Sequence, residues 1–460
     1  MVDRDVEMAR RVAERVFAAG GATYYVGGFV RDRLMGRPGK DVDIEVHGIR
    51  PETLREILDS LGERTEMGAS FGIYGLRHYT LDIAMPRKER AIGRGHKDFI
   101  VDVDPYLGER EAARRRDFTV NAMMENVLTG EIQDPFGGQK DLKSHVLRHV
   151  DDRSFPEDPL RVLRAAQFSA RLGFSVARET IEICKKVDLS ELPKERVMGE
   201  LKKALLQSRT PSAFFRVLRE MDQLKTWFPE VLALADVLQE PGFHPEGDAF
   251  EHTMCVLDEA GRLRVEAKNP LVFLFSALCH DFGKALTTAR GEDGRIHSYG
   301  HEVKGVPLAI RFLTRLTDER TILDGVPNLV ELHMRPGALT SQNAGRKSFM
   351  RLFDAATCPE DLILLFTADR LGSGADPENR LAEEKLYAEL AVYRRLMAEP
   401  WITAKDLKEA GIPAGPLYTE ALAYAKKLHL AGVNLPEAKA QVLAFARREL
   451  EGGTDGQKSL

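Results

Sequence analysis

The sequence has few cysteines and no long apolar run, and each of these absences excludes a class of protein. Its 460 residues include four cysteines, which stand singly and form no CxxC pair, so neither a disulfide framework nor a thiolate zinc site is expected. The longest apolar stretch, Pro270 to Cys279, is far shorter than the ~20 residues that cross a bilayer. The N-terminus carries charges instead of a signal-type apolar region, and we therefore expect a soluble cytoplasmic protein with no membrane partner.

There is also no strong excess of charge of one sign. The formal net charge is -5, although charged residues make up 30% of the chain. A surface that is basic throughout is therefore excluded, and any contact with nucleic acid must come from local basic patches. With 43% hydrophobic residues the chain can bury a large core, and its length suggests about three domains. No oligomeric state is predicted.

The spacing of apolar residues changes near residue 158. Before it, helical spacing predicts helices over Asp3–Ala19 and Pro51–Leu61. Short apolar or alternating runs predict strands at Tyr24–Val26, Val42–Val46, Gly72–Leu76 and Leu81–Met85. After it, long segments rich in Leu, Ala, Arg and Glu follow one another with helical periodicity, broken by prolines. The chain is therefore predicted to be α+β, with a mixed head domain followed by an essentially all-helical remainder.

Two glycines follow a predicted strand in the segment YYVGGFVRDRLMGRPGKDVDIEV (24–46), and two aspartates stand one residue apart near its end. Residues i and i+2 of a strand point to the same face, so Asp41 and Asp43 would present two carboxylates ~7 Å apart, which suits a divalent metal. Magnesium takes its other ligands from water and substrate phosphates, so a phosphate-bearing substrate is implied. Gly27 and Gly28 would let backbone amides approach those phosphates, and a helix starting just after them would add favourable potential.

Two further residues complete this candidate site. Arg31 would lie within one turn of the phosphates, and Asp82, in the alternating stretch YTLDIAM, is the natural third carboxylate. Three carboxylates allow a two-metal arrangement in which one ion activates a hydroxyl group and the other holds a triphosphate. On these residues alone the alternative stays open that Asp41 and Asp43 are solvated residues on an edge strand and that the glycines form a turn.

The complete string VGGFVRDRLMGRPGKDVDIEV resembles the signature of the polymerase-beta-like nucleotidyltransferases of the class II, bacterial-type CCA-adding tRNA nucleotidyltransferase and poly(A) polymerase family. The stretches RRRDFTVNAM, DPFGGQKDL and FPEDPLRVLRAAQFSARLGF resemble the next motifs of that family in the same order, so the resemblance covers about the first 210 residues. It implies that Asp41, Asp43 and Asp82 are catalytic, with Mg²⁺ on the first two. The nucleotide-binding residues that it implies are Gly27, Gly28, Arg31, Asp32, Arg116, Asp117, Asn121, Glu157, Asp158, Arg161 and Arg164.

The last of these motifs also has a physical interpretation. Helical spacing would put Asp158 and Arg161 side by side, with Glu157, Arg161 and Arg164 in one stripe. Asp158 only accepts hydrogen bonds and Arg161 only donates them. Cytosine and adenine each offer an amino donor beside a ring-nitrogen acceptor, so one acceptor–donor pair fits both, whereas guanine and uracil present the reverse pattern. The bare spacing favours an ordinary salt bridge within the helix, but the resemblance implies that this helix selects the incoming nucleotide and that Arg116 contacts it.

A charged segment, MPRKERAIGRGHKDF (85–99), contains Gly93 and Gly95 and from its residues alone would be a solvated loop. It resembles the flexible loop that CCA-adding and A-adding relatives possess and CC-adding relatives lack, which favours an enzyme able to add the terminal A. The stretch EMGASFGIYGLR (66–77) does not resemble the basic motif of bacterial poly(A) polymerases, which makes that alternative less favoured.

Histidines and aspartates recur through the helical part in a pattern, H…HD…D, that resembles the HD domain family. Adjacent His280 and Asp281 can chelate one ion, with further ligands from neighbouring helices. A bound divalent transition metal would activate water to attack a phosphate ester. The candidate ligands are His252, His280, Asp281 and Asp369, with His301 and His333 at the positions that supply a second metal in binuclear members. A degenerate helical scaffold that only supports RNA is the open alternative.

These motifs predict four parts. They are a nucleotidyltransferase head (1–150), a helical neck and body with the nucleotide-selecting helix and an RNA-binding region (151–240), an HD metal-dependent phosphohydrolase-like domain (241–375) and a helical tail (376–460). The predicted function is template-independent addition of CCA, or of its final A, to tRNA 3' ends from CTP and ATP. The alternatives are an HD phosphohydrolase of nucleotides or cyclic phosphates with an inactive head, a poly(A) polymerase, and a non-catalytic RNA-binding protein. The intact carboxylate sets disfavour the first and the last of these.

Overall fold

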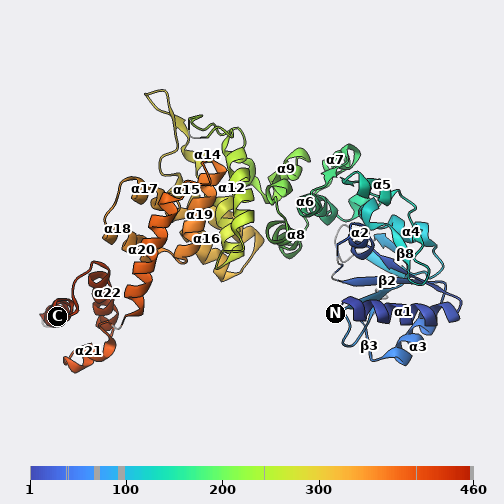
Figure 1. The fold of residues 1–460 in the computed structure, drawn as a ribbon, viewed down its shortest axis with the longest axis horizontal. Helices are drawn as coiled ribbons and strands as arrows, with labels where there is room; N and C mark the ends of the chain where they lie inside the picture. The colour runs from blue at the N-terminus through green and yellow to red at the C-terminus, as the bar shows by residue number, and fades with distance from the viewer. Residues whose placement is uncertain are drawn as a thin grey trace. The chain divides into compact units, whose positions relative to one another are not determined.

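The protein consists of two compact units, Met1–Pro229 and Glu230–Leu460, which are described in turn (Figure 1). The computed structural model describes residues 2–37, 39, 41–66, 73–91, 99–242, 244–399 and 401–455. A mixed sheet in the first unit is followed by helices, so the predicted α+β class is confirmed. The predicted division into four parts is finer than these two units and stays a prediction. Among the described residues, every helix is too short or too polar to cross a membrane.

A seven-stranded sheet lies at the centre of the first unit. Strands β2 and β5 run parallel, and the other neighbouring pairs are antiparallel. The two central strands β1 and β2 are buried along almost their whole length, because elements cover both faces of the sheet there. In spatial order the strands are β3 (Arg64–Glu66), β4 (Ile73–Leu76), β5 (Leu81–Ala84), β2 (Val42–His47), β1 (Ala22–Val26), β8 (Met124–Asn126) and β9 (Ile132–Gln133).

Helix α1 packs against β1, β2 and α3 through an apolar face that includes Met8, Val12 and Val16. The helices of this unit are α1 (Val2–Ala18), α2 (Gly28–Leu34), α3 (Pro51–Leu61), α4 (Glu109–Arg114), α5 (Gly138–Lys143), α6 (Leu160–Leu172), α7 (Arg178–Cys184), α8 (Lys194–Gln207), α9 (Ser212–Glu220) and α10 (Leu224–Trp227), with 3-10 turns η1 (Thr119–Asn121) and η2 (Phe155–Glu157). The two helices and four strands predicted in the head are confirmed as α1, α3, β1, β2, β4 and β5, although Gly72 lies outside the described residues. Short strands β10 (Val146–Leu147) and β11 (Ser175–Val176) pair in parallel.

The charged segment 85–99 differs in part from the predicted loop. Its described ends form two strands, β6 (Arg87–Ala91) and β7 (Phe99–Val103), which pair antiparallel. The aromatic and β-branched residues of β7 (FIVDV) suit a strand, whereas β6 (RKERA) is mostly charged. Gly93 and Gly95 lie outside the described residues.

The helix that carries the second motif begins later than its spacing suggests. Turn η2 ends at Glu157, Asp158 is extended (φ -113°, ψ 99°), and α6 starts at Leu160. The reason is Pro159, because the residue before a proline avoids the helical region. The predicted placement of Asp158 and Arg161 on one helix is therefore wrong, and their neighbours must be taken from the structure.

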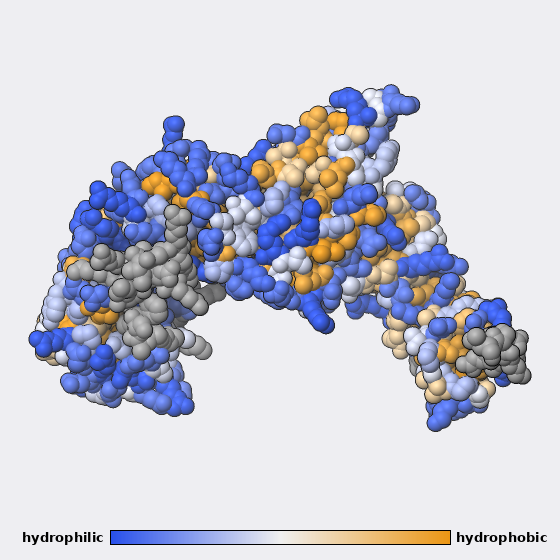
Figure 2. Space-filling model, turned by 180° about the vertical axis from the view of Figure 1, so that it is seen from behind, coloured by the Kyte–Doolittle hydropathy of each residue, from blue (hydrophilic) through white to orange (hydrophobic). Residues whose placement is uncertain are grey.

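The second unit is almost entirely helical, and its core includes the fully buried rings of Phe250, Phe273, Phe275 and Phe312. Its helices are α12 (Ala249–Leu263), α13 (Pro270–Cys279), α14 (Lys284–Thr287), α15 (His301–Leu316), α16 (Arg320–Leu332), α17 (Arg335–Ser341), α18 (Arg346–Ala355), α19 (Pro359–Gly372), α20 (Leu381–Ala398), α21 (Ala404–Glu409), α22 (Leu417–Leu430) and α23 (Leu435–Asp455), preceded by α11 (Pro229–Leu232) where the two units join. Helices α21 to α23 enclose a small core of their own. Strands β12 (Ala289–Arg290) and β13 (Ile296–His297) form a hairpin. Polar residues cover most of the face seen in Figure 2, with apolar residues gathered in patches.

Candidate functional site

A tight turn joins β1 to α2 and brings its backbone next to charged side chains. Gly27 has a positive φ of 68°, which favours glycine, and α2 begins at Gly28, as expected. A Cβ atom at Gly27 would lie 3.1 Å from Nη1 of Arg116 and 3.9 Å from Oδ2 of Asp43. The glycine therefore permits a close approach between the turn, a guanidinium and a carboxylate.

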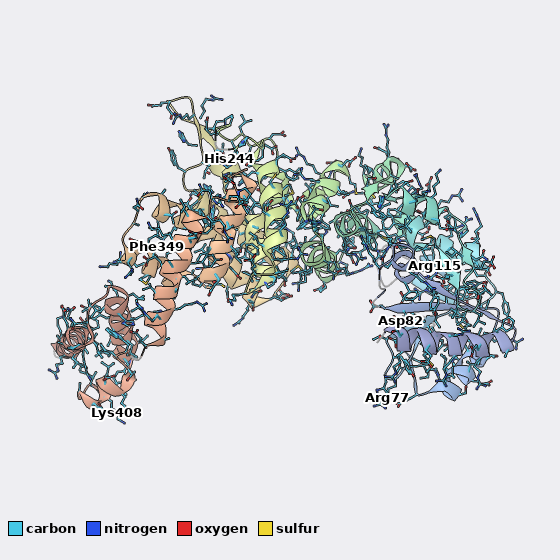
Figure 3. All side chains as sticks on the ribbon, in the orientation of Figure 1. Arg77, Asp82, Arg115, His244, Phe349 and Lys408 are labelled. Atoms are coloured by element: carbon cyan, nitrogen blue, oxygen red, sulfur yellow. The ribbon has the colours of Figure 1, made fainter. Side chains whose placement is uncertain are left out.

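The predicted carboxylates gather where β2 and β5 lie side by side. The parallel register pairs Asp43 with Asp82, and Asp41 directly precedes β2 (Figure 3 labels Asp82). Burial and the charges of Asp82 and Asp41 raise the pKa of Asp43 to about 6, although Arg116 opposes the shift. Negative charge is therefore concentrated here, as a cation site requires. Among the described residues, the sets of three or more ligand atoms that all lie within 4.8 Å of one another are in the second unit, so the three head carboxylates do not all lie within that distance of one another.

Glu45 lies two residues beyond Asp43 on β2 and is buried beneath the arginines of the RRRD motif. Its Oε2 lies 3.1 Å from Nη2 of Arg115 and 3.6 Å from Nη2 of Arg116, and its Oε1 lies 3.0 Å from Nε2 of His47. Burial alone would raise the pKa of Glu45, but the hydrogen bond with His47 and the two guanidiniums lower it to about 2. Glu45 was not among the predicted site residues. A glutamate inside a predicted buried strand was the signal that could have found it.

A continuous chain of hydrogen bonds links five of the predicted nucleotide-binding residues. Arg31, which is buried, donates from Nε to Oδ1 of Asp32 (2.8 Å) and from Nη1 to Oδ1 of Asn121 (2.6 Å). Asn121 donates in turn to Oδ1 of Asp117 (2.9 Å), and Asp117 Oδ2 accepts from Nε of Arg164 (2.7 Å). Burial acts to raise the pKa of Asp117, but Arg164 and these hydrogen bonds lower it, so the carboxylate stays charged. The glycine turn and helix α6 are thus held in one network.

Three guanidiniums surround the ring of Phe168 on α6. The Cζ atoms of Arg31, Arg164 and Arg171 lie 5.1, 5.1 and 5.0 Å from its centroid. The first two have carboxylate partners in the network, whereas Arg171 donates to Oε1 of Gln207 at 3.5 Å. This local excess of positive charge suits phosphate groups, as expected for a protein that is not basic overall.

The two residues expected to read a base are held by different partners. Asp158 accepts from Nη1 and Nη2 of Arg196 (3.3 and 3.2 Å), a residue that sequence reasoning missed. Arg161 donates from Nη1 to the carbonyl of Ser154 and from Nη2 to the carbonyl of Arg115, both at 2.6 Å. Each side chain is thus fixed without using all its hydrogen-bonding capacity. Glu157, in contrast, is exposed at the end of η2.

We expect the buried charge of Glu45 to matter for stability. Glu45→Gln should lower the free energy of unfolding at neutral pH by about 3–5 kcal/mol, because it leaves Arg115 and Arg116 without their buried partner. The folded-state pKa of about 2 lies below the unfolded value, so this contribution is present above pH 4.5 and lost as the pH falls towards 2. Urea unfolding at pH 7 and pH 3 measures both effects. The control Glu63→Gln, which removes an exposed pair with Arg77, should cost under ~1 kcal/mol; equal losses in the two variants would contradict the prediction.

In the second unit, six predicted metal ligands converge from five helices and their ends. They form two groups with ligand atoms within 4.8 Å: His252, His280 and Asp369 in one, and Asp281, His301 and His333 in the other. In the first group, His252 Nε2 lies 3.3 Å from His280 Nε2 and 3.1 Å from Asp369 Oδ1. In the second, His301 Nε2 lies 3.2 Å from His333 Nε2.

The carboxylate of Asp281 lies between the two groups. Its Oδ2 is 3.2 Å from His280 Nε2 and 3.4 Å from His252 Nε2, and its Oδ1 is 3.2 Å from His301 Nε2. Lys284 Nζ lies 2.6 Å from Oδ2, but among the described residues this buried oxygen accepts no hydrogen bond of good geometry. A buried carboxylate that faces imidazole nitrogens of both groups would suit a divalent metal ion.

Each histidine of this cluster is oriented through its other ring nitrogen. The Nδ1 atoms bond to Glu246 Oε1 (His252, 2.7 Å), Ala277 O (His280, 2.8 Å), Ser298 O (His301, 2.8 Å) and Val330 O (His333, 2.6 Å). Because a carbonyl only accepts, the Nδ1 atoms bonded to carbonyls carry protons, so the other ring nitrogen, Nε2, faces the cluster as the possible metal-binding atom. Burial and the neighbouring His280 lower the pKa of His333 to about 3, which keeps that ring neutral.

A glycine after the His-Asp pair brings two of the ligand-bearing segments together. A Cβ atom at Gly283 would lie 2.0 Å from the carbonyl oxygen of His301 and 2.7 Å from the amide nitrogen of Gly305. Only glycine permits this approach, so the turn that carries Asp281 can lie against the start of α15.

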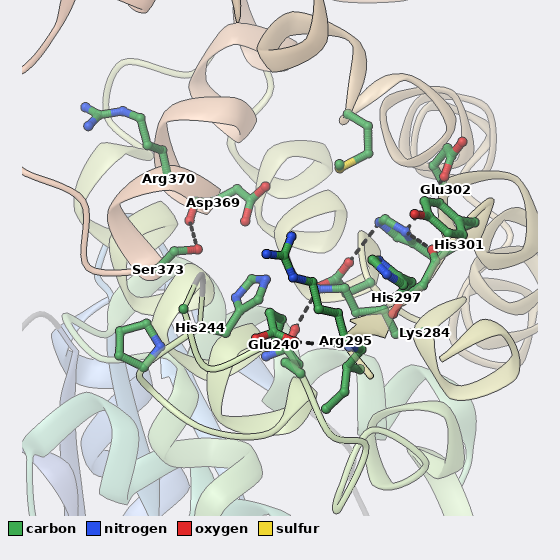
Figure 4. A pocket seen from close by; sticks show the side chains of 18 of the residues that line it. Glu240, His244, Lys284, Arg295, His297, His301, Glu302, Asp369, Arg370 and Ser373 are labelled. Carbon is green, nitrogen blue, oxygen red and sulfur yellow. Dashed lines mark hydrogen bonds and ion pairs between the residues drawn. The ribbon is translucent and has the colours of Figure 1, made fainter. Parts of the chain in front are cut away.

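The cluster opens into a pocket of about 960 Å³ (Figure 4). Asp281, His301 and Asp369 line it, together with Lys284 and Arg295. Its size is at the upper end for small-molecule sites, so it has room for more than a phosphate group.

Both units of the chain match known protein families. Residues 23–148 match the family model "Poly A polymerase head domain", 173–234 match "Probable RNA and SrmB- binding site of polymerase A", and 249–373 match "HD domain". The "Multifunctional CCA protein" of Halorhodospira halophila is 36% identical over 438 residues, which cover 91% of this chain and 98% of that protein. Its namesake in Actinobacillus pleuropneumoniae serotype 5b is 39% identical over 317 residues, covering 67% and 74%.

The chain belongs to the multifunctional CCA protein family. This confirms the family recognised from the motifs, and it favours a CCA-adding nucleotidyltransferase with an HD domain over the alternative functions. The solved structure of the Thermotoga maritima CCA-adding enzyme complexed with tRNA has a TM-score of 0.64 at 21% identity and covers 95% of this chain and 94% of its own. That of the Bacillus stearothermophilus enzyme in complex with CTP has a TM-score of 0.65 at 22% identity, covering 97% and 99%. These likenesses show the fold.

Nucleotidyltransferases and HD domains generally use divalent metals. In this member of the multifunctional CCA protein family, both sites have carboxylates or imidazoles suited to such ions. Two residues that contact the predicted ligands of this cluster were not predicted from the sequence. Lys284 stands one helical turn after Asp281, and this spacing was a usable signal. Glu246 lies in a segment, HPEGD, whose residues predict only a loop, and it had no signal.

Proposed function

We propose that this chain adds CCA, or its terminal A, to the 3' end of tRNA from CTP and ATP. The proposal rests on the meeting of Asp41, Asp43 and Asp82 beside the Gly27 turn and the guanidinium of Arg116. Such a set suits a nucleoside triphosphate, because carboxylates hold its metal ions while backbone amides and guanidiniums hold its phosphates.

The residues around this site have separate tasks. Asp41 and Asp43 would hold Mg²⁺, which would neutralise the triphosphate and lower the pKa of the attacking hydroxyl. The 3'-hydroxyl oxygen bonds to the α-phosphorus, and the bond from that phosphorus to the β-phosphate oxygen breaks, so pyrophosphate leaves. Asp82, whose pKa is raised by partial burial and by Asp41, is suited to accept the hydroxyl proton. Arg31 and Arg116 offset the charge of the leaving pyrophosphate.

For nucleotide choice we propose that Asp158 accepts from the amino group of cytosine or adenine and Arg161 donates to the neighbouring ring nitrogen. The bidentate contact with Arg196 and the two carbonyls that hold Arg161 support this, because they preorganise both groups without pairing them with each other. A salt bridge between Asp158 and Arg161, which their spacing alone favoured, would instead have paired the two side chains with each other.

The function itself is tested with four tRNA substrates: one that lacks the whole CCA end, one that lacks its last two nucleotides, one that lacks only its last nucleotide, and one that is complete. Each is incubated with CTP, ATP, GTP or UTP alone and with CTP and ATP together. Addition of C to the first two, and of A to the third, is the expected result, in keeping with a cytoplasmic enzyme of tRNA ends. Extension of a complete tRNA by many A residues would instead indicate a poly(A) polymerase.

Replacing both Asp158 and Arg161 with Ala should erode the preference for C over U. We expect a loss of about 1–3 kcal/mol for each lost hydrogen bond, which is about 5- to 150-fold, because a mismatched base no longer leaves buried charges unpaired. The measurement is kcat/KM for CTP, UTP, ATP and GTP on one tRNA. Glu182→Ala, at an exposed position on α7, is the control. A double variant that is slower but equally selective would place base reading elsewhere.

A second activity is proposed for the second unit, namely hydrolysis of phosphate esters. Two groups of ligands sharing Asp281 support it, because such a set would hold two divalent ions, and its imidazoles favour transition metals. Metal ions there would supply an activated water and polarise the phosphate. The side chain of Lys284 lines the pocket and adds a positive charge for the ester oxygens.

A further inference from the structure

Hydrogen bonds hold the β12–β13 hairpin beside the cluster of candidate metal ligands. Its backbone N–H at Ile296 donates to Oε2 of Glu240 (3.0 Å), and the hydroxyls of Thr288 and Ser298 lie 2.8 Å apart across its base. The carbonyl of Ser298 is also the acceptor that orients His301. The hairpin is therefore built into the same framework as a metal ligand, and its side chains have a set position relative to the cluster.

Two aromatic rings stack at the end of this hairpin. The rings of His297 and Tyr299 lie 4.9 Å apart with an angle of 14° between their planes. Tyr299 is 81% exposed, and both residues line the pocket of the HD site. A large exposed aromatic ring is costly in water, but a pre-stacked pair offers a flat face on which a nucleobase can stack.

A cation lies on the same hairpin. Arg295 lines the pocket and points into it (Figure 4). Within the described part of the chain, no carboxylate lies within ion-pair distance of its guanidinium, whereas Arg370, on the far side of the pocket, pairs with Glu383 at 2.7 Å. A guanidinium without a carboxylate partner in a pocket is suited to a phosphate group.

We propose that this hairpin is the specificity element of the HD site and selects nucleoside phosphates. The His297–Tyr299 pair receives the base, Arg295 binds the phosphate, and the ester is thereby brought to the cluster around Asp281. The pocket volume of about 960 Å³ supports a substrate larger than a simple phosphate ester. This inference rests on the proposed phosphohydrolase function of the same site.

The test compares two phosphate monoesters that differ in having a base. The metal-loaded full chain is given cytidine 2'(3')-phosphate or glycerol 2-phosphate, and released phosphate is measured. Tyr299→Ala should raise KM for the cytidine phosphate about 5- to 150-fold with little change in kcat, and should leave the glycerol phosphate unaffected. Tyr299→Phe, which keeps the ring, should behave as the unaltered protein. Arg295→Ala should raise KM for both substrates, because both carry the phosphate.

Other results would overturn the inference. If Tyr299→Ala affects both substrates equally, the hairpin only supports the site; if it affects neither, the base does not stack there. If the unaltered protein hydrolyses neither ester, the proposed hydrolase function is wrong. The role of the hairpin is then tested by measuring ligand binding instead. In that case the affinity of the metal-loaded protein for cytidine 2'(3')-phosphate must still fall in Tyr299→Ala, while its affinity for inorganic phosphate stays the same. A trinucleotide ending in the same phosphate then shows whether the site takes free nucleotides or RNA ends.

Discussion

Replacing Asp43 with Ala should reduce nucleotide addition at least about a thousandfold while tRNA binding stays nearly unchanged. Asp43 is the central carboxylate of its site, since the sheet register places it beside Asp82 and its raised pKa reflects the charges of both Asp82 and Asp41. If Asp43 is a metal ligand as proposed, its removal impairs phosphoryl transfer and leaves the contacts that hold tRNA in place. The same result is expected for Asp41→Ala.

Single-turnover rates with CTP and a tRNA that lacks its CCA end measure the chemical step, and a filter or gel-shift assay measures tRNA binding. Asp59→Ala is the matched control, because Asp59 is an exposed carboxylate on α3 of the same unit. A variant at Asp43 that keeps near-normal turnover with magnesium would remove the basis for the two-metal assignment. Equal loss of tRNA binding would show that the carboxylate has a structural role instead.

The second large effect is expected at Asp281. Asp281→Asn keeps the volume of the side chain but removes the charge between the two ligand groups, so metal-dependent hydrolysis of phosphate esters should be lost. Nucleotide addition should continue at the normal rate, because the head carboxylates lie in the other unit and would bind ions of their own. Asp324→Asn, at an exposed position on α16, is the control.

Metal content after dialysis and circular dichroism accompany these rates, since Asp281 also has Lys284 beside it and a misfolded variant must be recognised. Loss of both activities in a well-folded Asp281→Asn protein would mean that the two sites are not independent. Retained hydrolysis with normal metal content would mean that the cluster does not catalyse it.

Those parts of the head site that depend on residues close together in the sequence could be predicted. The glycine turn and the start of α2 follow from short-range rules. The parallel pairing that places Asp43 beside Asp82 joins distant segments and does not follow from such rules, although Asp82 itself was predicted as the third carboxylate. The partners of Asp158 could not be predicted in this way. Pro159 in the sequence argued for a break before the helix, but nothing local connects Asp158 with Arg196, 38 residues further along.

The second unit shows the same limit. The histidines and aspartates of the cluster were predicted as ligands from their pattern, because each ligand type is chemically distinctive. Glu246 and the stacked pair at His297 and Tyr299 are ordinary loop residues by sequence. Their roles depend on tertiary positions that no periodicity encodes.

The hydrogen-bonded chain from Asp32 through Arg31, Asn121 and Asp117 to Arg164 has a consequence for dividing this protein. A fragment that ends at residue 150 would keep Arg31 and Asp117 but lose the guanidinium that balances the Asp117 carboxylate and the ring of Phe168 beneath Arg31. In a chimera that takes only the catalytic sheet from a relative, one part of the network would come from each protein. The two parts would not have evolved together. Exchange at residue 229, where the first compact unit ends, keeps the whole chain of bonds within one parent.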